Sequence, residues 1–299
     1  MQDFQLKEKT SGVSGIVRVH RYKGGTANQY AALCAAGKHV EANQLLRDNW
    51  LGLASEKRNM IVSSTGYGKN IIAKRLASDN TYTGNITHGE IGRGYTAPGA
   101  PTVGTGAAGV LTGAYKYKVT FVTATGETEG GTASSTVNPA SQQVSVSAIP
   151  TGGADVTSRK VYRTLAGGST YYFLTTIADN VTTTYTDNAT DASISSGTTA
   201  PTSTTAGARA TTLVDTGLQT GQIRAAFTTA AAVNNIVTIR FFFSDATLPN
   251  GTYSEFGTFI DGSATLGTGQ LFNRATFSST GYVKATGEDT SIEVEIDVN

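Results

Sequence analysis

The spacing of apolar residues predicts helices only near the start of the chain. Over residues 26–46 the apolar positions follow a helical period that is interrupted near Gly37, which predicts one or two short helices. Residues 69–77 predict another short helix, with apolar side chains on one face and Lys74 and Arg75 on the other. Three apolar residues are expected to form a packed tail of the first helices: Trp50, Leu51 and Leu53.

Beyond residue 77 the pattern is that of strands. In the middle of the chain the expected strands are regularly spaced, at 114–123, 133–137, 143–148, 160–164, 170–177 and 181–186. In the first of them the side chains at 115, 117, 119 and 121 fall on one face, because successive residues of a strand point to opposite sides. Short strands with this spacing are typical of a small β-sandwich.

The last third of the chain also predicts strands, at 222–228, 237–243, 252–260, 271–278 and 291–298. Asn250 and Gly251 both tolerate a positive φ, so they predict a tight hairpin between the second and third of these strands. The final strand alternates Ile and Val with acidic residues. This alternation predicts one buried face and one acidic face.

Two uncharged stretches rich in Gly, Ser, Thr, Ala and Pro separate these regions, at 95–109 and 193–207. Their composition predicts linkers. The first has Gly104, Gly106 and Gly109 at the spacing of a dinucleotide-binding turn. No apolar strand precedes it and no helix follows, so a linker remains the better interpretation.

Composition favours an all-β globular protein. Charged residues make up 15% and apolar residues 38%, and the β-branched threonine is even more frequent than the 35 glycines, which argues against helical repeats and against disorder. Cys34, the only cysteine, cannot form an intrachain disulfide and is expected to be a buried structural thiol. The chain has no apolar run long enough to span a membrane and its start does not resemble a signal peptide, so we expect synthesis in the cytoplasm and no membrane partner.

Charge is divided unevenly along the chain. The first 75 residues carry a net charge of about +7 and the rest about −6. The densest basic patch lies at 18–23, where Arg18, His20 and Tyr22 share one strand face while Arg21 and Lys23 share the other. Because no single face is basic, a nucleic-acid partner is not expected. The charge instead predicts an acidic protein neighbour, such as the C-terminal strand of another copy.

Few residues are candidates for binding a phosphate group or a metal ion. The segment 66–69 has the composition of a phosphate loop, but its glycines are wrongly spaced and Asn70 stands where a hydroxyl would meet magnesium, so a helix N-terminus is expected. The three histidines are far apart in the sequence and no cysteine pair accompanies them: His20, His39 and His88.

Two groups of acidic residues are candidate sites. Three strand-edge acids are candidates for a hydrolytic pair but lack an aromatic-lined groove: Asp245, Glu255 and Asp261. Another group offers calcium ligands, although Asx-rich turns form without metal: Asp187, Asn188 and Asp191. The sequence therefore predicts no enzyme and assigns no catalytic, cofactor-binding or metal-binding residue.

Several segments resemble known proteins. The central block, in its strands at 113–129, 158–164 and 171–187, resembles immunoglobulin-like and fibronectin-III-like modules. The flanking parts, at 59–92 and 251–298, resemble a β-domain found in tail, collar and fibre proteins of tailed bacteriophages. The resemblance covers roughly 240 of the 299 residues and indicates a family rather than one protein.

The resemblance implies an architecture. The two flanks form one discontinuous β-sandwich domain with a small helical N-terminal part, and the Ig-like β-sandwich is inserted between them. The expected boundaries are 1–100 for the first half, 101–204 for the insert with its linkers, and 205–299 for the second half. Exposed loops tolerate such insertions because the ends of an inserted domain lie close together.

The resemblance also implies a function. We expect a non-enzymatic, homo-oligomeric structural protein of a tailed-phage virion, placed in the tail, collar or fibre with other virion proteins and carrying the Ig-like module outward. A head decoration (cement) protein is one alternative. The other is an adhesin module that binds host-surface glycans through exposed tyrosines of the insert: Tyr171, Tyr172 and Tyr185. None of these functions requires a cofactor.

Overall fold

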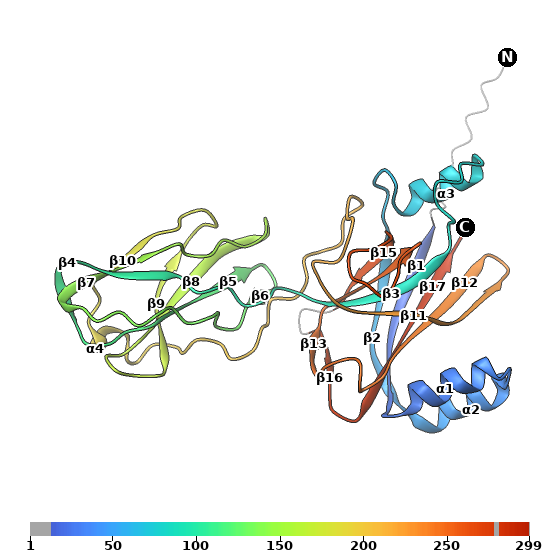
Figure 1. Ribbon diagram of the computed structural model, residues 1–299, viewed down its shortest axis with the longest axis horizontal. Coiled ribbons are helices and arrows are strands. Elements are labelled where there is room, and N and C mark those ends of the chain that lie inside the picture. Colours follow the sequence, from blue (N-terminus) through green and yellow to red (C-terminus); the bar gives the residue numbers. More distant parts are fainter. Residues whose placement is uncertain (1–12, 278–280, 299) are drawn as a thin grey trace, which may run out of the picture. The chain divides into compact units, whose positions relative to one another are not determined.

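The computed structural model describes residues 13–277 and 281–298 and divides them into two compact units (Figure 1). The barrel unit contains the described residues up to Gly94 and those from Ala208 onward, and the insert contains residues 95–207. Both units are built mainly from strands, so the predicted mainly β fold class is confirmed. The barrel unit is therefore assembled from two separate parts of the chain.

Eight strands of the barrel unit form a closed, antiparallel barrel. In order around it they are β1 (Ser14–Lys23), β17 (Glu288–Asp297), β12 (Ile236–Phe243), β11 (Thr220–Val233), β3 (Ile86–Arg93), β14 (Glu255–Ile260), β15 (Gln270–Thr276) and β2 (Trp50–Ile61). The structure replaces the open sandwich expected for the flanks by this barrel, because β2 pairs with β1 along its length and also meets β15 at Met60 and Ile61. Closure pairs strand edges that an open sheet leaves free.

The pairing of β1 with β17 accounts for the uneven charge. These strands pair along their whole length, with Arg18 opposite Glu293. The Arg18 guanidinium lies 2.7 Å from the carboxylate of Glu56 and 3.1 Å from that of Glu295. Arg18 and Arg21 thus have acidic partners on β17 of the same chain, since the antiparallel register places these side chains together. The expected acidic strand of another copy is not needed for these two residues.

Apolar side chains fill the inside of the barrel. Ile292, Val294 and Ile296 are each at most 4% exposed, whereas Glu293 and Glu295 lie on the other face, which confirms the predicted alternation of the last strand. The interior is completed by aromatic and aliphatic residues of the other strands, among them Val17, Val19, Ile61, Ile91, Phe241, Phe256, Phe272 and Phe277. The barrel is a packed core rather than an open channel.

The predicted helices are confirmed. α1 (Thr26–Ala35) and α2 (His39–Asn49) are separated at Gly37, whose φ of +72° favours glycine. They pack over the barrel strands through Tyr30 and Leu46, and the rings of Tyr30 and Phe242 are 5.3 Å apart (Figure 1). α3 (Gly68–Leu76) begins where a helix N-terminus was expected and places Ile71 in the barrel core.

Two predictions about connecting residues are wrong. Trp50, Leu51 and Leu53 are 54%, 41% and 47% exposed, because α2 ends at Asn49 and these residues enter β2, where they pair with β1 instead of packing on the helices. The expected hairpin at Asn250 and Gly251 does not form, because β12 is already flanked by β11 and β17. Gly251 instead begins β13 (Gly251–Tyr253), which pairs with β16 (Tyr282–Lys284).

The insert is a sandwich of two sheets. One sheet has the order β10-β7-β4 and the other β6-β5-β8-β9. Their bounds are β4 (Thr102–Thr112), β5 (Tyr117–Thr123), β6 (Gly126–Glu127), β7 (Ala140–Ser147), β8 (Val156–Thr164), β9 (Tyr171–Ile177) and β10 (Tyr185–Asp187), with a short helix α4 (Asp191–Ile194). Tyr117 and Val119 meet Val144 and Val146 in a shared core, which confirms the predicted inward face of β5. The insert therefore has a core of its own.

The two stretches predicted to be linkers are part of the insert. Residues 102–112 form β4, which pairs with β7 in an irregular register. A Cβ on Gly109 would lie 2.6 Å from the backbone nitrogen of Gln143, so the glycine permits a close approach of two strands rather than a flexible connection. In the second stretch, Ala206 is buried and Thr205 hydrogen-bonds to the backbone of Glu127. Both linker predictions are therefore wrong.

A buried ionic cluster holds the chain to the barrel where it returns from the insert. Asp215, in the returning segment 208–219, lies 2.7 Å from the Arg274 guanidinium, which is also 2.7 Å from Glu255. These three side chains are at most 2% exposed. The carboxylate of Glu255 also accepts hydrogen bonds from the backbone N–H groups of Gln219, at the end of the returning segment, and Thr220, the first residue of β11. The cluster therefore joins β14 and β15 to the returning segment.

A second buried ion pair lies close to this cluster. Arg224 on β11 donates a hydrogen bond to the carboxylate of Glu90 on β3, and both side chains are almost fully buried. A Cβ on Gly221 would lie 1.6 Å from a Glu90 oxygen, so only glycine leaves room for this carboxylate. Burial raises the pKa of Glu90, and the nearby guanidinium of Arg224 opposes that shift.

Candidate functional site

The acidic residues considered for hydrolysis have separate structural partners. Glu255 is bound by Arg274, Asp245 by Lys284, and Asp261 accepts a hydrogen bond from the Thr83 hydroxyl. Each carboxylate is engaged at a different point of the barrel unit. These contacts join each carboxylate to a cation or a hydroxyl group of the fold.

An arginine occupies the position considered for calcium. The Arg163 guanidinium lies 2.7 Å from the carboxylate of Asp187 and 2.9 Å from that of Asp191. The side-chain oxygen of Asn188 accepts a hydrogen bond from the backbone N–H of Val110. Among residues 13–277 and 281–298, no group of three or more His, Cys, Asp or Glu could hold a metal ion.

The three histidines lie on different elements. His39 is the exposed first residue of α2, His88 lies on β3, and His20 lies on β1 beside Arg18 and Arg240. The Nε2 atom of His20 is buried and has no hydrogen-bond partner in the described part of the chain. Burial lowers the pKa of His20, and Arg240 and Arg18 add to this effect while Glu293 and Glu56 oppose it.

Replacing His20 with glutamine is expected to reduce the pH dependence of stability between pH 7 and pH 5. The unfolded histidine gains its proton near pH 6.5, whereas the folded one does so at lower pH. The free energy of unfolding of the wild type therefore falls as the pH drops below about 6.5, by at most about 1.4 kcal/mol per pH unit, until the folded pKa is passed. Urea unfolding at several pH values measures this; equal slopes for His20→Gln and wild type would contradict it.

One end of the barrel carries an apolar groove of about 560 Å³. It lies between α3, the start of β3, Val13 just before β1, and the strands β17, β12, β11 and β15. No charged residue lines it; the lining residues are Val13, Ile72, Gly84, Asn85, Ile86, Thr87, Phe227, Ala230, Val237, Ile239, Phe272, Ile296 and Val298. We call this surface the apolar end.

Large apolar side chains around the apolar end are open to solvent. Phe227 is 44% exposed, Val298 52%, and Val233, the last residue of β11, 68%. Leu76, the last residue of α3, is 83% exposed. Apolar surface gathered in this way around a groove is typical of a surface that another molecule covers.

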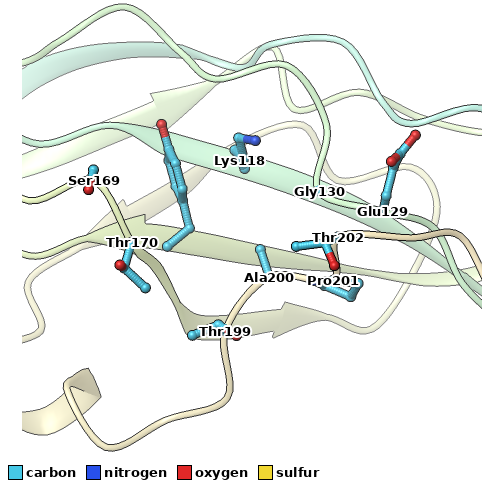
Figure 2. Close-up of a pocket in the computed structure, with 10 residues that line it drawn as sticks. Lys118, Glu129, Gly130, Ser169, Thr170, Thr199, Ala200, Pro201 and Thr202 are labelled. Atoms are coloured by element: carbon cyan, nitrogen blue, oxygen red, sulfur yellow. The ribbon is translucent and has the colours of Figure 1, made fainter.

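The insert carries a different kind of hollow, a polar groove of about 450 Å³ (Figure 2). Lys118 of β5 and Glu129 line it together with the segment 199–202 and the residues at the start of β9. The Lys118 ammonium lies 4.9 Å from the centre of the Tyr171 ring, within the range of a cation–π contact. We call this hollow the Tyr171 groove.

The three tyrosines considered for glycan binding lie in different surroundings. Tyr171 lines the Tyr171 groove. Tyr185 packs against the core of the insert, and the backbone of Tyr172 pairs with Thr199. The structure therefore does not bring these tyrosines together in one platform, and the other groove residues, Lys118 and Glu129, were not found from the sequence.

Comparisons with family models, with curated proteins and with solved structures find no match to this chain. No helix in the described residues is long and apolar enough to cross a membrane.

Proposed function

We propose that this protein is a non-enzymatic structural component of a tailed-phage virion, whose copies assemble through the apolar end of the barrel. The apolar end is the observation that carries the assembly proposal, because it combines an uncharged groove with exposed large apolar side chains. Burying such side chains stabilises an interface by roughly 25 cal/mol per Å² of apolar surface removed from water. Assembly therefore removes from water apolar side chains that remain exposed in a single subunit.

A second copy of the chain is the proposed occupant of the apolar end. The groove and the exposed side chains next to it, such as Val233 and Val298, belong to one continuous part of the barrel unit. Around a two-fold axis each copy offers both its groove and its exposed side chains to the other, as self-complementary interfaces do. The absence of charge from the lining means that no like charges oppose this contact.

The sequence resemblance to tail, collar and fibre proteins supports placing the assembly in a virion. The division of the chain into a barrel unit and an insert with its own core is compatible with that proposal. In the virion the barrel unit makes contacts between subunits and the insert, as an independent module, extends toward other molecules.

Val298→Asp is expected to shift the purified full-length chain from an oligomer to a monomer. The substitution places a carboxylate in the apolar groove, where its desolvation opposes association. Val110→Asp, in the insert, is the matched control, because Val110 is 53% exposed and Val298 52%. Light scattering after size exclusion measures the mass of each protein.

Retention of the oligomer by Val110→Asp and its loss by Val298→Asp would support the apolar end as the interface. A wild-type chain that is monomeric at micromolar concentration would overturn assembly through this surface. An oligomer that survives Val298→Asp would overturn the location of the interface. Circular dichroism of each variant shows that the barrel remains folded.

A further inference from the structure

The Tyr171 groove gathers two charged groups that form no ion pair with any described residue. Most charged residues of the insert form ion pairs: Glu127 with Lys160, Arg159 with Asp179, and Arg163 with Asp187 and Asp191. Four charged residues of the insert form none with a described residue, and two of them, Lys116 and Asp155, lie outside the groove. Lys118 and Glu129, the remaining two, form no ion pair among the described residues, and both line this groove. The groove therefore holds one ammonium, whose contact is with the Tyr171 ring, and one carboxylate, neither of them in an ion pair among the described residues.

Hydroxyl groups complete the polar lining. Four residues of the groove have side-chain hydroxyls that make no hydrogen bond within the described residues: Ser169, Thr170, Thr199 and Thr202 (Figure 2). They come from two segments of the chain, the turn before β9 and the strand-like segment whose Ala200 N–H donates to the carbonyl of Tyr171. The groove thus presents both donors and acceptors.

An apolar surface lies beside these polar groups. The ring of Tyr171 is only partly buried, and Ala200 and Pro201 line the groove with it. Aromatic rings that combine an apolar face with a polar edge suit ligands with alternating C–H and O–H groups. The volume of about 450 Å³ is in the range of small-molecule sites.

We infer that the Tyr171 groove binds a neutral saccharide unit, a hexose or an N-acetylhexosamine of a surface polysaccharide. The C–H face of a sugar ring packs on Tyr171, Ala200 or Pro201, while Glu129 accepts from its hydroxyls and Lys118 donates to them. Hydrogen bonds to charged groups are stronger than neutral ones, so these two residues orient the sugar. One positive and one negative group give the groove no net charge, which favours a neutral over an acidic sugar. The inference concerns the insert alone and does not depend on how the barrel unit assembles.

An array of neutral and acidic oligosaccharides, probed with the full-length chain, tests the inference. We expect binding to neutral hexose or N-acetylhexosamine oligosaccharides and not to the acidic ones. The array ligand with the strongest signal is then titrated by calorimetry into the wild type and its variants. Lys118→Met and Glu129→Gln are each expected to weaken its affinity about tenfold or more, because each removes a charge-assisted hydrogen bond.

Lys116→Met and Asp155→Asn are the matched controls. They remove the only other unpaired charges of the insert, outside the groove, and are expected to leave the affinity unchanged. Absence of binding on the array, binding to acidic glycans only, or equal losses in the control variants would overturn the inference. The mass of the oligomer, measured in the same samples, reports the assembly proposal separately.

Discussion

Arg274→Met is expected to lower the free energy of unfolding of the barrel unit by about 3–5 kcal/mol. The Arg274 side chain is fully buried and lies 2.7 Å from both Glu255 and Asp215, which are themselves at most 2% exposed. Methionine fills much of the space but leaves the buried carboxylate of Glu255 without its cation and that of Asp215 with only the partly exposed Arg209. The substitution therefore removes the ion pairs that join the returning segment to β14 and β15.

The only tryptophan of the chain, Trp50, lies on β2, so its fluorescence during urea unfolding reports the barrel unit. Arg209→Met is the control, because Arg209 also binds Asp215 but is 35% exposed, and we expect a loss of about 1 kcal/mol or less. Neutralising both acids in the Arg274→Met background, with Asp215→Asn and Glu255→Gln, is expected to restore part of the stability. A loss below about 1 kcal/mol for Arg274→Met would contradict this account.

Arg163→Met is expected to destabilise the insert by a similar amount, about 3–5 kcal/mol, without affecting the barrel unit. Arg163 and Asp187 are both fully buried and 2.7 Å apart. The hydroxyl of Tyr117 donates to the same carboxylate at 2.8 Å, and burial together with Asp187 raises the pKa of this tyrosine. Removing the guanidinium leaves the Asp187 charge with only the hydroxyl and nearby backbone donors.

Hydrogen exchange followed by mass spectrometry separates the two units, since peptides from 95–207 report only the insert. Faster exchange in those peptides, with an unchanged Trp50 unfolding transition, is the expected result for Arg163→Met. Lys160→Met is the control, because Lys160 is 33% exposed in its pair with Glu127 and its loss is expected to cost about 1 kcal/mol or less. An equal shift of the barrel transition would show that the two units do not unfold independently.

Local periodicity predicted the helices and many strands, among them β5, β8, β9, β12 and β17, but not β2 or β4, and it did not predict how the strands pair. The alternation of β17 and the inward face of β5 follow from a period of two, which any strand with one buried face displays. The closed barrel follows from the pairing of β1 with β17 and with β2, and no local pattern reports a register between residues at opposite ends of the chain. The expected sandwich and the hairpin at Gly251 differ from the structure for this reason.

The linker predicted at residues 95–109 is wrong because its glycines were interpreted as a sign of flexibility. A stretch with four glycines and two prolines has the composition of a linker, because glycine usually occurs in turns. In β4 the same residue type serves another purpose, since a side chain at Gly109 would collide with β7. Composition alone does not distinguish these two uses of glycine.

The candidate sites were predicted only in part. Tyr171 was singled out because it is aromatic, but Lys118 and Glu129 became candidates only when the structure showed which charges of the insert lack a partner. One part of the apolar end can be recognised in the sequence as the apolar run at the end of β11, up to Val233. Its exposure could not be predicted, because a run of this kind is equally typical of a buried strand.

The pairing of β1 with β17 also determines the order in which the protein is completed during translation. β1 leaves the ribosome long before its partner β17, so the barrel cannot close until β17 has been made. The insert, whose residues are contiguous, has its entire core synthesised well before β11 appears. For that interval the nascent chain carries a folded insert beside open strands, and these unpaired edges are the surface that the cell's chaperones encounter.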